Sequence, residues 1–231
     1  MRLAIIPARG GSKRIPKKNI KNFHGKPIIA YSIEALLNSN MLDKVIVSTD
    51  DVEIAEVAKK YGAEVPFMRP SDISDDFATT GDVIKHAVEW FNQKGDTIEL
   101  VCCLYATSPF VKMNDISESI KLLTLDTKCV FSAAEFSYPI FRSFKLDDSN
   151  VPSMFWPENF TERSQDLESA YHDAGMFYIA KPEFFVDNKL IFAEHSKACL
   201  IPHYRVQDID TPEDWIRAEI MYDALRRNGD I

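Results

Sequence analysis

Short, continuously apolar segments alternate with amphipathic helical patterns along most of the chain. The first apolar runs cover residues 3–6, 44–48 and 64–68, and helical patterns over 27–38 and 52–61 separate them. A strand that is apolar on both faces belongs in a sheet that helices cover on each side. The alternation therefore predicts an α/β fold with a doubly wound, mostly parallel sheet.

The alternation continues to the end of the chain with one interruption. We expect helices at 80–94 and 116–125 and strands at 99–104, 129–134, 175–180 and 198–201. A last helix is expected over 212–227, because Thr211 is a good N-cap, Pro212 suits the first helical position and Asp214 follows three residues after the cap. A chain of 231 residues accommodates these elements in a single domain, 1–231.

Residues 135–168 interrupt this pattern. They are rich in aromatic residues, proline, aspartate and asparagine. Because a structureless loop of this length is uncommon in a compact domain, we expect a small inserted arm that contacts substrate or a second subunit.

Charge is distributed unevenly along the chain. Eight of the 27 basic residues, and none of the 35 acidic ones, lie within residues 1–33. The net charge of −8 argues against nucleic acid as a partner. A basic segment on an acidic protein indicates a local anion site, with a solvated basic loop as the alternative.

The composition excludes several other classes. No apolar run approaches the roughly 20 residues that a membrane span requires, and the first residues do not resemble a secretory signal. The four cysteines form no CxxC motif, and the five histidines show no metal-ligand spacing. We expect a cytoplasmic protein with no membrane partner and with reduced, buried cysteines.

A basic loop with two glycines follows the first predicted strand. It reads Arg9-Gly10-Gly11-Ser12-Lys13-Arg14 and continues to Lys18 and Asn19. Ligands of open α/β sheets bind beyond the carboxyl ends of the strands, where this loop lies. Glycines allow close approach of the backbone to an anion, and the cations offset the charge of a polyphosphate. The pattern predicts a phosphate site, although it matches neither a Walker A loop nor a dinucleotide fingerprint.

Acidic residues form two further groups. Asp208 and Asp210 are two residues apart on an extended segment, so their carboxylates point the same way, and such oxygens suit Mg²⁺ that bridges phosphates. Acid enrichment at a helix start explains Glu213 and Asp214 but not Asp208. The second group would repel a triphosphate, so we expect most of its members to be solvated or to cap a helix; it comprises Asp72, Asp75, Asp76 and Asp82.

Taken together, the motifs resemble the CMP-sialic acid synthetase family. The run IIPARGGSKRIPKKN is followed by VSTD at 47–50, Arg69-Pro70, ATSPF at 106–110, RSQD at 163–166 and QDIDTPED at 207–214. The combination of YATSPF, RSQDLESAYHDAG and GMFYIA is most similar to the pseudaminic acid cytidylyltransferase branch. The resemblance implies a nucleotide-diphospho-sugar transferase-like fold. It also implies transfer of CMP from CTP to the anomeric hydroxyl of a nonulosonic acid, with release of pyrophosphate.

The resemblance further implies roles for individual residues. The nucleotide-binding residues that it implies are Arg9, Gly10, Gly11, Ser12, Lys13, Lys18, Asn19, Arg69, Ala78 and Thr80. Binding of the acidic nine-carbon sugar falls to Tyr105, Thr107, Ser108, Arg163, Gln165, Tyr171 and Gly175, of which Arg163 would pair with the sugar carboxylate. The expected catalytic residues are Arg9, Lys18, Asp208 and Asp210, and the two aspartates are also the expected Mg²⁺ ligands.

Two departures from the family pattern concern the sugar. Tyr105-Ala106 stands where the family commonly has Gln-Pro, and Val111 stands where a basic residue often follows. Both argue against N-acetylneuraminate, and Tyr105 favours pseudaminic acid, whose tail is more apolar. N-acetylneuraminate and Kdo remain alternative sugars, and a non-catalytic nucleotide-binding module is the alternative from another class. The resemblance and the aromatic arm also suggest a homodimer.

Overall fold

A six-stranded sheet forms the centre of the computed structural model, which describes residues 1–187 and 189–231. From edge to edge the strands are β10 (Ser196–Leu200), β6 (Cys129–Glu135), β9 (Tyr171–Ala180), β5 (Leu100–Leu104), β1 (Arg2–Pro7) and β4 (Lys44–Ser48). β1 pairs in parallel with β4 and β5, and β10 pairs in parallel with β6. β9 is antiparallel to both of its neighbours. The prediction of a mostly parallel sheet is confirmed.

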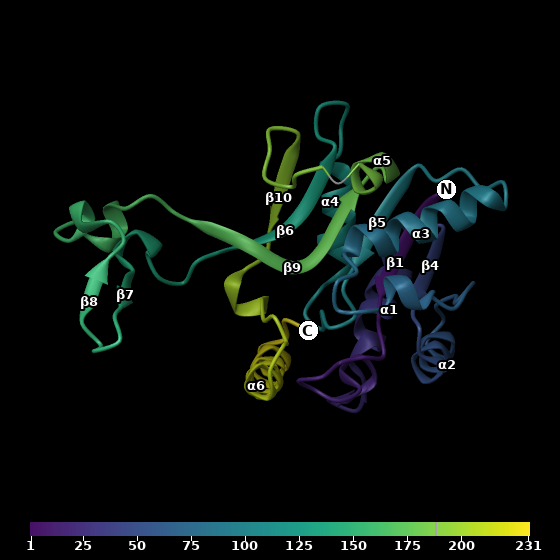
Figure 1. Ribbon diagram of the computed structural model, residues 1–231, viewed down its shortest axis with the longest axis horizontal. Coiled ribbons are helices and arrows are strands. Elements are labelled where there is room, and N and C mark those ends of the chain that lie inside the picture. Colours follow the sequence, from purple (N-terminus) through teal and green to yellow (C-terminus); the bar gives the residue numbers. More distant parts are fainter. Residues whose placement is uncertain (188) are drawn as a thin grey trace.

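Helices cover both faces of the sheet (Figure 1). The larger core cluster receives side chains from α1 (Ile28–Asn38), α2 (Val52–Lys60), α4 (Met113–Lys121) and α6 (Pro212–Asn228). The opposite face packs against α3 (Thr80–Gln93), with α5 (Pro182–Val186) beside it. Along β1, Ala4 and Ile6 join the first cluster while Leu3 and Ile5 join the second, and all four are fully buried. Burial on both faces therefore explains why this strand is apolar at every position.

Side-chain caps start the helices that border the carboxyl end of the sheet. The Asp51 carboxylate accepts hydrogen bonds from two amides of α2, and the pairs Thr79/Asp82 and Thr211/Asp214 form capping boxes on α3 and α6. These bonds satisfy amides that the first turn of a helix leaves without partners.

Some predicted elements differ from the observed ones. The strand expected at 64–68 forms only two isolated bridges to β4 and its following residue, since Pro66 has no amide to donate to a ladder. The helix expected at 116–125 begins at Met113, because Asp115 accepts a hydrogen bond from the Lys112 amide at 2.9 Å and so caps the earlier turn. β9 begins at Tyr171 rather than at 175, because its first residues pair with Ala133–Glu135 across a register shift in β6.

An aromatic cluster fixes α6 to the hairpin of β2 (Asn22–Phe23) and β3 (Lys26–Pro27). The Phe23 ring meets the rings of Tyr31, Trp215 and Tyr222 edge to face, at centroid distances of 5.6, 5.5 and 5.3 Å. This contact joins the C-terminal helix to the chain segment that follows the basic loop. The segment 208–210, just before α6, is thereby held beside that loop.

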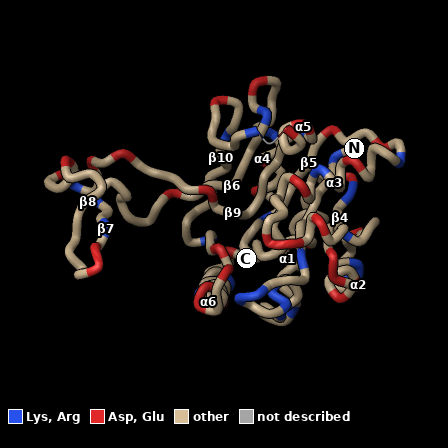
Figure 2. Tube along the Cα trace, in the orientation of Figure 1, with Lys and Arg blue, Asp and Glu red and all other residues tan. Residues whose placement is uncertain are grey.

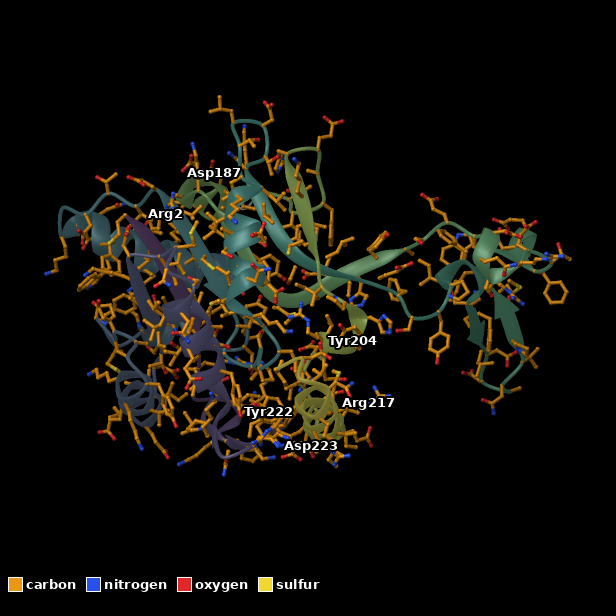
Figure 3. The ribbon with its side chains drawn as sticks, turned by 180° about the vertical axis from the view of Figure 1, so that it is seen from behind. Arg2, Asp187, Tyr204, Arg217, Tyr222 and Asp223 are labelled. Atoms are coloured by element: carbon orange, nitrogen blue, oxygen red, sulfur yellow. The ribbon has the colours of Figure 1, made fainter. Side chains whose placement is uncertain are left out.

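Residues between β6 and β9 form an arm that projects from the body (Figure 1). It contains the antiparallel pair β7 (Phe144–Leu146) and β8 (Pro152–Met154), with short 3₁₀ turns around them. Figure 3 shows its side chains gathered about these strands, away both from Tyr222 and Asp223 on α6 and from Arg2 and Asp187 on the body. Exposed apolar side chains of the arm include Tyr138, Phe144, Leu146, Val151, Phe155 and Phe160.

Two further expectations concern cysteines and membranes. All four cysteines are free thiols, and burial raises the pKa of Cys102 and of Cys129 to about 12, so these thiols stay protonated. Within the described residues, no helix combines the length and the apolar character that crossing a bilayer requires.

Candidate active site

A cavity of about 570 Å³ lies beyond the carboxyl ends of β1 and β5. Four segments line it: the basic loop (residues 9–19), the stretch from 69 to the first turn of α3, the residues after β5, and the segment before α6. The lining residues are Pro7, Arg9, Ser12, Lys13, Arg14, Lys18, Asn19, Arg69, Asp76, Ala78, Thr79, Thr80, Val83, Tyr105, Ala106, Thr107, Asp208 and Asp210. Segments far apart in sequence therefore converge where ligands of open α/β sheets bind.

The basic loop is shaped by packing against neighbouring side chains. The Gly10 amide donates to Asp50 Oδ1 at 2.9 Å, and a Cβ at Gly10 would lie 2.7 Å from Asp51 Oδ2. Asn19 is nearly buried and donates from Nδ2 to the Arg9 carbonyl at 2.9 Å, which closes the loop. Gly10 and Gly11 are not among the residues that line the cavity, and their contact with the nucleotide stays a prediction. Gly10 permits the close approach of the loop to the start of α2.

Lys18 connects the basic loop to the segment before α6. Its ammonium donates to the Ile209 carbonyl at 2.6 Å and to Asp210 Oδ1 at 3.1 Å. Arg14 approaches the other oxygen of Asp210 at 2.8 Å. Burial alone would raise the pKa of Asp210, but Lys18 and Arg14 outweigh it and lower that pKa. Asp210 is therefore a firmly ionised carboxylate held between two cations.

Asp208 has a different environment. Its carboxylate lines the cavity and forms no ion pair within the part of the chain that the structure describes; the Ile209 backbone amide and the nearby charge of Lys18 favour its ionised form. Desolvation by the cavity wall, together with the charge of Asp210, raises the pKa of Asp208. The described part of the chain contains no cluster of three or more His, Cys, Asp or Glu residues that could hold a metal ion. The pair could hold Mg²⁺ only with additional oxygen ligands, as substrate phosphates and water supply.

Arg69 carries a nearly buried guanidinium in the cavity wall. Its backbone amide donates to the Thr49 carbonyl at 2.8 Å, and its Nε donates to Ser74 Oγ at 3.2 Å. Nη2 lies 3.6 Å from Asp50 and has no hydrogen-bond partner among the described residues. Because a buried donor without a partner is costly, this nitrogen is suited to a ligand oxygen or nitrogen.

A second cavity, of about 240 Å³, shares Thr80 and Tyr105 with the first. The hydroxyl groups of Thr80 and Tyr105 are 3.0 Å apart, and the Tyr105 ring meets the Tyr178 ring at 5.8 Å. Tyr178 donates its hydroxyl to Asp173 Oδ2 at 2.5 Å. The remaining residues that line the second cavity are Gly81, Phe184, Phe185, Lys189 and Ile191. These residues could not be predicted from the sequence, because a pattern of apolar positions after a strand does not distinguish a cavity wall from core packing.

Several predicted sugar-binding residues do not reach either cavity within one chain. Arg163 and Gln165 lie on the arm, and Tyr171 lines a separate hollow near its root. Ser108 is buried outside the cavity lining. Gly175 lies within β9 with φ 61°, where its amide is held by Asp173 Oδ1 at 2.8 Å. Of the predicted sugar-binding residues, only Tyr105 and Thr107 line the first cavity.

Comparisons with known proteins agree on one kind of protein. The family model for cytidylyltransferases matches residues 3–136. The chain is 46% identical to a pseudaminic acid cytidylyltransferase of Campylobacter jejuni over 95% of both chains. It is 36% identical to a CMP-N,N'-diacetyllegionaminic acid synthase of Legionella pneumophila over 94% of both. A solved structure of CMP:2-keto-3-deoxy-manno-octonic acid synthetase complexed with CTP matches with a TM-score of 0.70 at 15% identity, covering 97% of this chain and 99% of that one, which establishes likeness of fold.

Proposed function

The chain belongs to the cytidylyltransferase family, and on this basis we propose that it transfers CMP from CTP to the anomeric hydroxyl of pseudaminic acid and releases pyrophosphate. The observation that carries the proposal is one cavity in which the basic loop faces Asp208 and Asp210. Identity over nearly the whole length of the Campylobacter jejuni relative supports the choice of sugar.

The proposed reaction needs positioned cations more than it needs covalent chemistry. The anomeric oxygen forms a bond to the α-phosphorus, the bond from that phosphorus to the oxygen of pyrophosphate breaks, and the hydroxyl proton passes to water. Negative charge develops on the phosphate oxygens, so fixed positive groups lower the barrier. Arg9 and Lys18, with Lys13 and Arg14, supply such groups in the cavity.

We include Mg²⁺ as a cofactor of the proposed reaction. Asp208 and Asp210 would hold it together with phosphate oxygens, a donor set of the hard oxygen type that Mg²⁺ prefers. The Asp208 carboxylate supports this assignment, because it lines the cavity and forms no ion pair with a described residue. When bound, the ion would offset charge on the phosphates.

For the nucleoside we propose the wall formed by Arg69, Ala78 and Thr80. Nη2 of Arg69, which has no hydrogen-bond partner among the described residues, would donate to O2 or N3 of cytosine, both of which are acceptors.

The sugar would extend from the first cavity into the second. Tyr105 lies at the junction, and the walls beyond it combine the apolar side chains of Phe184, Phe185 and Ile191 with Tyr178 and Lys189. The apolar part of these walls suits a methyl group at C9, and a hydroxyl seated against that part would have no hydrogen-bond partner. An unpaired buried hydroxyl costs about 1–3 kcal/mol, more than the ~0.8 kcal/mol that burial of one methyl contributes.

We further propose that the active form is a homodimer in the cytoplasm. The exposed apolar side chains of the arm favour burial against a second copy. Because Arg163 and Gln165 lie outside the cavities of their own chain, they would serve the partner's site, where Arg163 could pair with the sugar carboxylate.

The proposed function is tested by measuring pyrophosphate release while four nucleoside triphosphates are crossed with a panel of acidic sugars. We expect turnover with CTP and pseudaminic acid. Equal rates with ATP or UTP would contradict the nucleotide assignment, and CTP binding without turnover with any sugar would instead support a non-catalytic module.

The shared site is tested by mixing two variants under conditions that exchange subunits. Arg163→Ala and Lys18→Met should each be nearly inactive alone. A mixed dimer retains one complete site if Arg163 acts across the interface, so an equal mixture should regain about a quarter of native activity. No regain, with exchange demonstrated by mass, would place Arg163 outside the partner's site.

A further inference from the structure

Asp76 is an acidic residue of the first cavity that the proposed reaction does not use. It lies on the loop between the short 3₁₀ turn Ser71–Ile73 and α3. Its Oδ1 lies 2.7 Å from Arg9 Nη1, and its Oδ2 lies 2.5 Å from Lys13 Nζ. Arg9 also donates to the Asp75 carbonyl at 2.9 Å. One carboxylate thus bridges two cations of the basic loop. Figure 2 shows this loop as a group of Lys and Arg residues near α6.

The loop does not need the Asp76 carboxylate for its own conformation. Asp75 accepts hydrogen bonds from two following amides at 2.9 Å, and Asp82 completes the cap of α3. Among the described residues, the Asp76 carboxylate contacts only Arg9 and Lys13 as polar partners. Its function therefore concerns those two cations.

The Asp76 carboxylate makes with Arg9 and Lys13 the contacts that a phosphate group of the ligand would make. Two oxygens of a polyphosphate could make the same two contacts, but the like charges of carboxylate and phosphate would repel each other at this distance. The Asp76 side chain is 44% exposed, so its ion pairs exchange readily with water. Asp76 can hold the cations in an empty site and yield them to a more highly charged ligand.

Building on the proposed function, we infer that Asp76 competes with polyphosphate for Arg9 and Lys13. It weakens the binding of CTP and of pyrophosphate and thereby promotes release of the pyrophosphate product.

The inference is tested by titrating Asp76→Asn with CTP and, separately, with pyrophosphate in a calorimeter, in buffer that contains Mg²⁺. We expect Kd for both ligands to fall by about 3- to 10-fold, because two partly exposed ion pairs no longer compete. The matched control is Asp72→Asn, which removes the same charge from the same segment at a position without an ion pair among the described residues. Its Kd values should stay within about twofold of native.

A second background separates competition from a general charge effect. In a Lys13→Met protein, Asp76→Asn should tighten binding less than it does in the native chain, since one of its two pairs is already absent. An equal gain in both backgrounds would overturn the assignment to these cations. Asp76→Ala should behave as Asp76→Asn does.

Unchanged or weaker binding by the Asp76 variants would overturn the inference, and weaker binding with a higher Mg²⁺ requirement would assign Asp76 to metal or substrate instead. Measurement of ligand binding by the native protein distinguishes failure of the inference from failure of the proposed function. If the native protein binds CTP and Asp76→Asn does not bind it more tightly, the inference alone fails. If the native protein binds neither CTP nor pyrophosphate, both fail.

Discussion

Replacement of Lys18 by methionine removes one ammonium group from the cavity and keeps most of the side-chain length. The native side chain is only 19% exposed, and its ammonium contacts the Ile209 carbonyl and Asp210. The variant therefore loses a fixed positive charge at the point where the basic loop meets the aspartate pair. We expect a large loss of catalysis with little change in fold.

The magnitude follows from the partial burial of this charge. A charge contact shielded from water is stronger than one on the surface, and loss of one such contact to a developing negative charge costs about 2–4 kcal/mol of transition-state stabilisation. This corresponds to a fall of roughly 30- to 1,000-fold in kcat/KM.

The assay is pyrophosphate release with CTP and pseudaminic acid, with thermal unfolding measured in parallel. Lys17→Met is the matched control, because Lys17 is the adjacent residue, pairs with Glu53 and does not line the cavity. It should retain activity within about threefold of native. A fall of less than threefold in Lys18→Met, or an equal fall in both variants, would refute the role given to Lys18.

Three further predictions concern the metal, a helix cap and the sugar. Asp208→Asn and Asp210→Asn should each remove most Mg²⁺-dependent activity and leave the melting temperature near native; near-native rates at limiting Mg²⁺ would contradict the assignment. Thr211→Ala should cost about 1 kcal/mol of unfolding free energy at pH 7. The hydrogen bond from Thr211 lowers the folded-state pKa of Asp214, so its stabilisation of the fold is complete above the unfolded pKa near 4 and is lost as pH falls through the lower folded pKa. The loss of unfolding free energy in Thr211→Ala should therefore be smaller at pH 3 than at pH 7. Denaturant unfolding at both pH values measures this difference. Tyr178→Ala removes a ring that lines the second cavity, so it should raise KM for the sugar several-fold and leave KM for CTP unchanged; the reverse pattern would remove Tyr178 from the sugar site.

The parts of the fold that sequence analysis predicted are those with local signals. The apolar run of β1 reports burial on both faces, and the basic loop follows at the carboxyl end of that strand, so the position of the cavity could be inferred. The cap of α6 carries its own signature in Thr211 and Asp214. Each of these signals lies within a few residues of the structure it specifies.

The parts that sequence analysis could not supply depend on contacts between distant segments. The apolar pattern of β9 does not predict that this strand runs antiparallel to β5 and β6, because a buried strand has the same apolar pattern whichever way it runs. The ion pairs of Asp76 join residues more than 60 positions apart, and acidic composition alone suggested solvation. Gly10 illustrates the same limit, since the side chain that leaves no room for a Cβ at this position belongs to Asp51, the N-cap residue of α2.

The most direct test of the proposed function is a competition in which equal concentrations of pseudaminic acid and N-acetylneuraminate share limiting CTP. Mass spectrometry of the CMP-sugars gives the ratio of the two kcat/KM values in one mixture. We predict at least a tenfold excess of CMP-pseudaminic acid, equivalent to about 1.4 kcal/mol, since a sialic hydroxyl is left unpaired beside the apolar wall. Comparable amounts of the two products, or an excess of CMP-N-acetylneuraminate, would contradict the account.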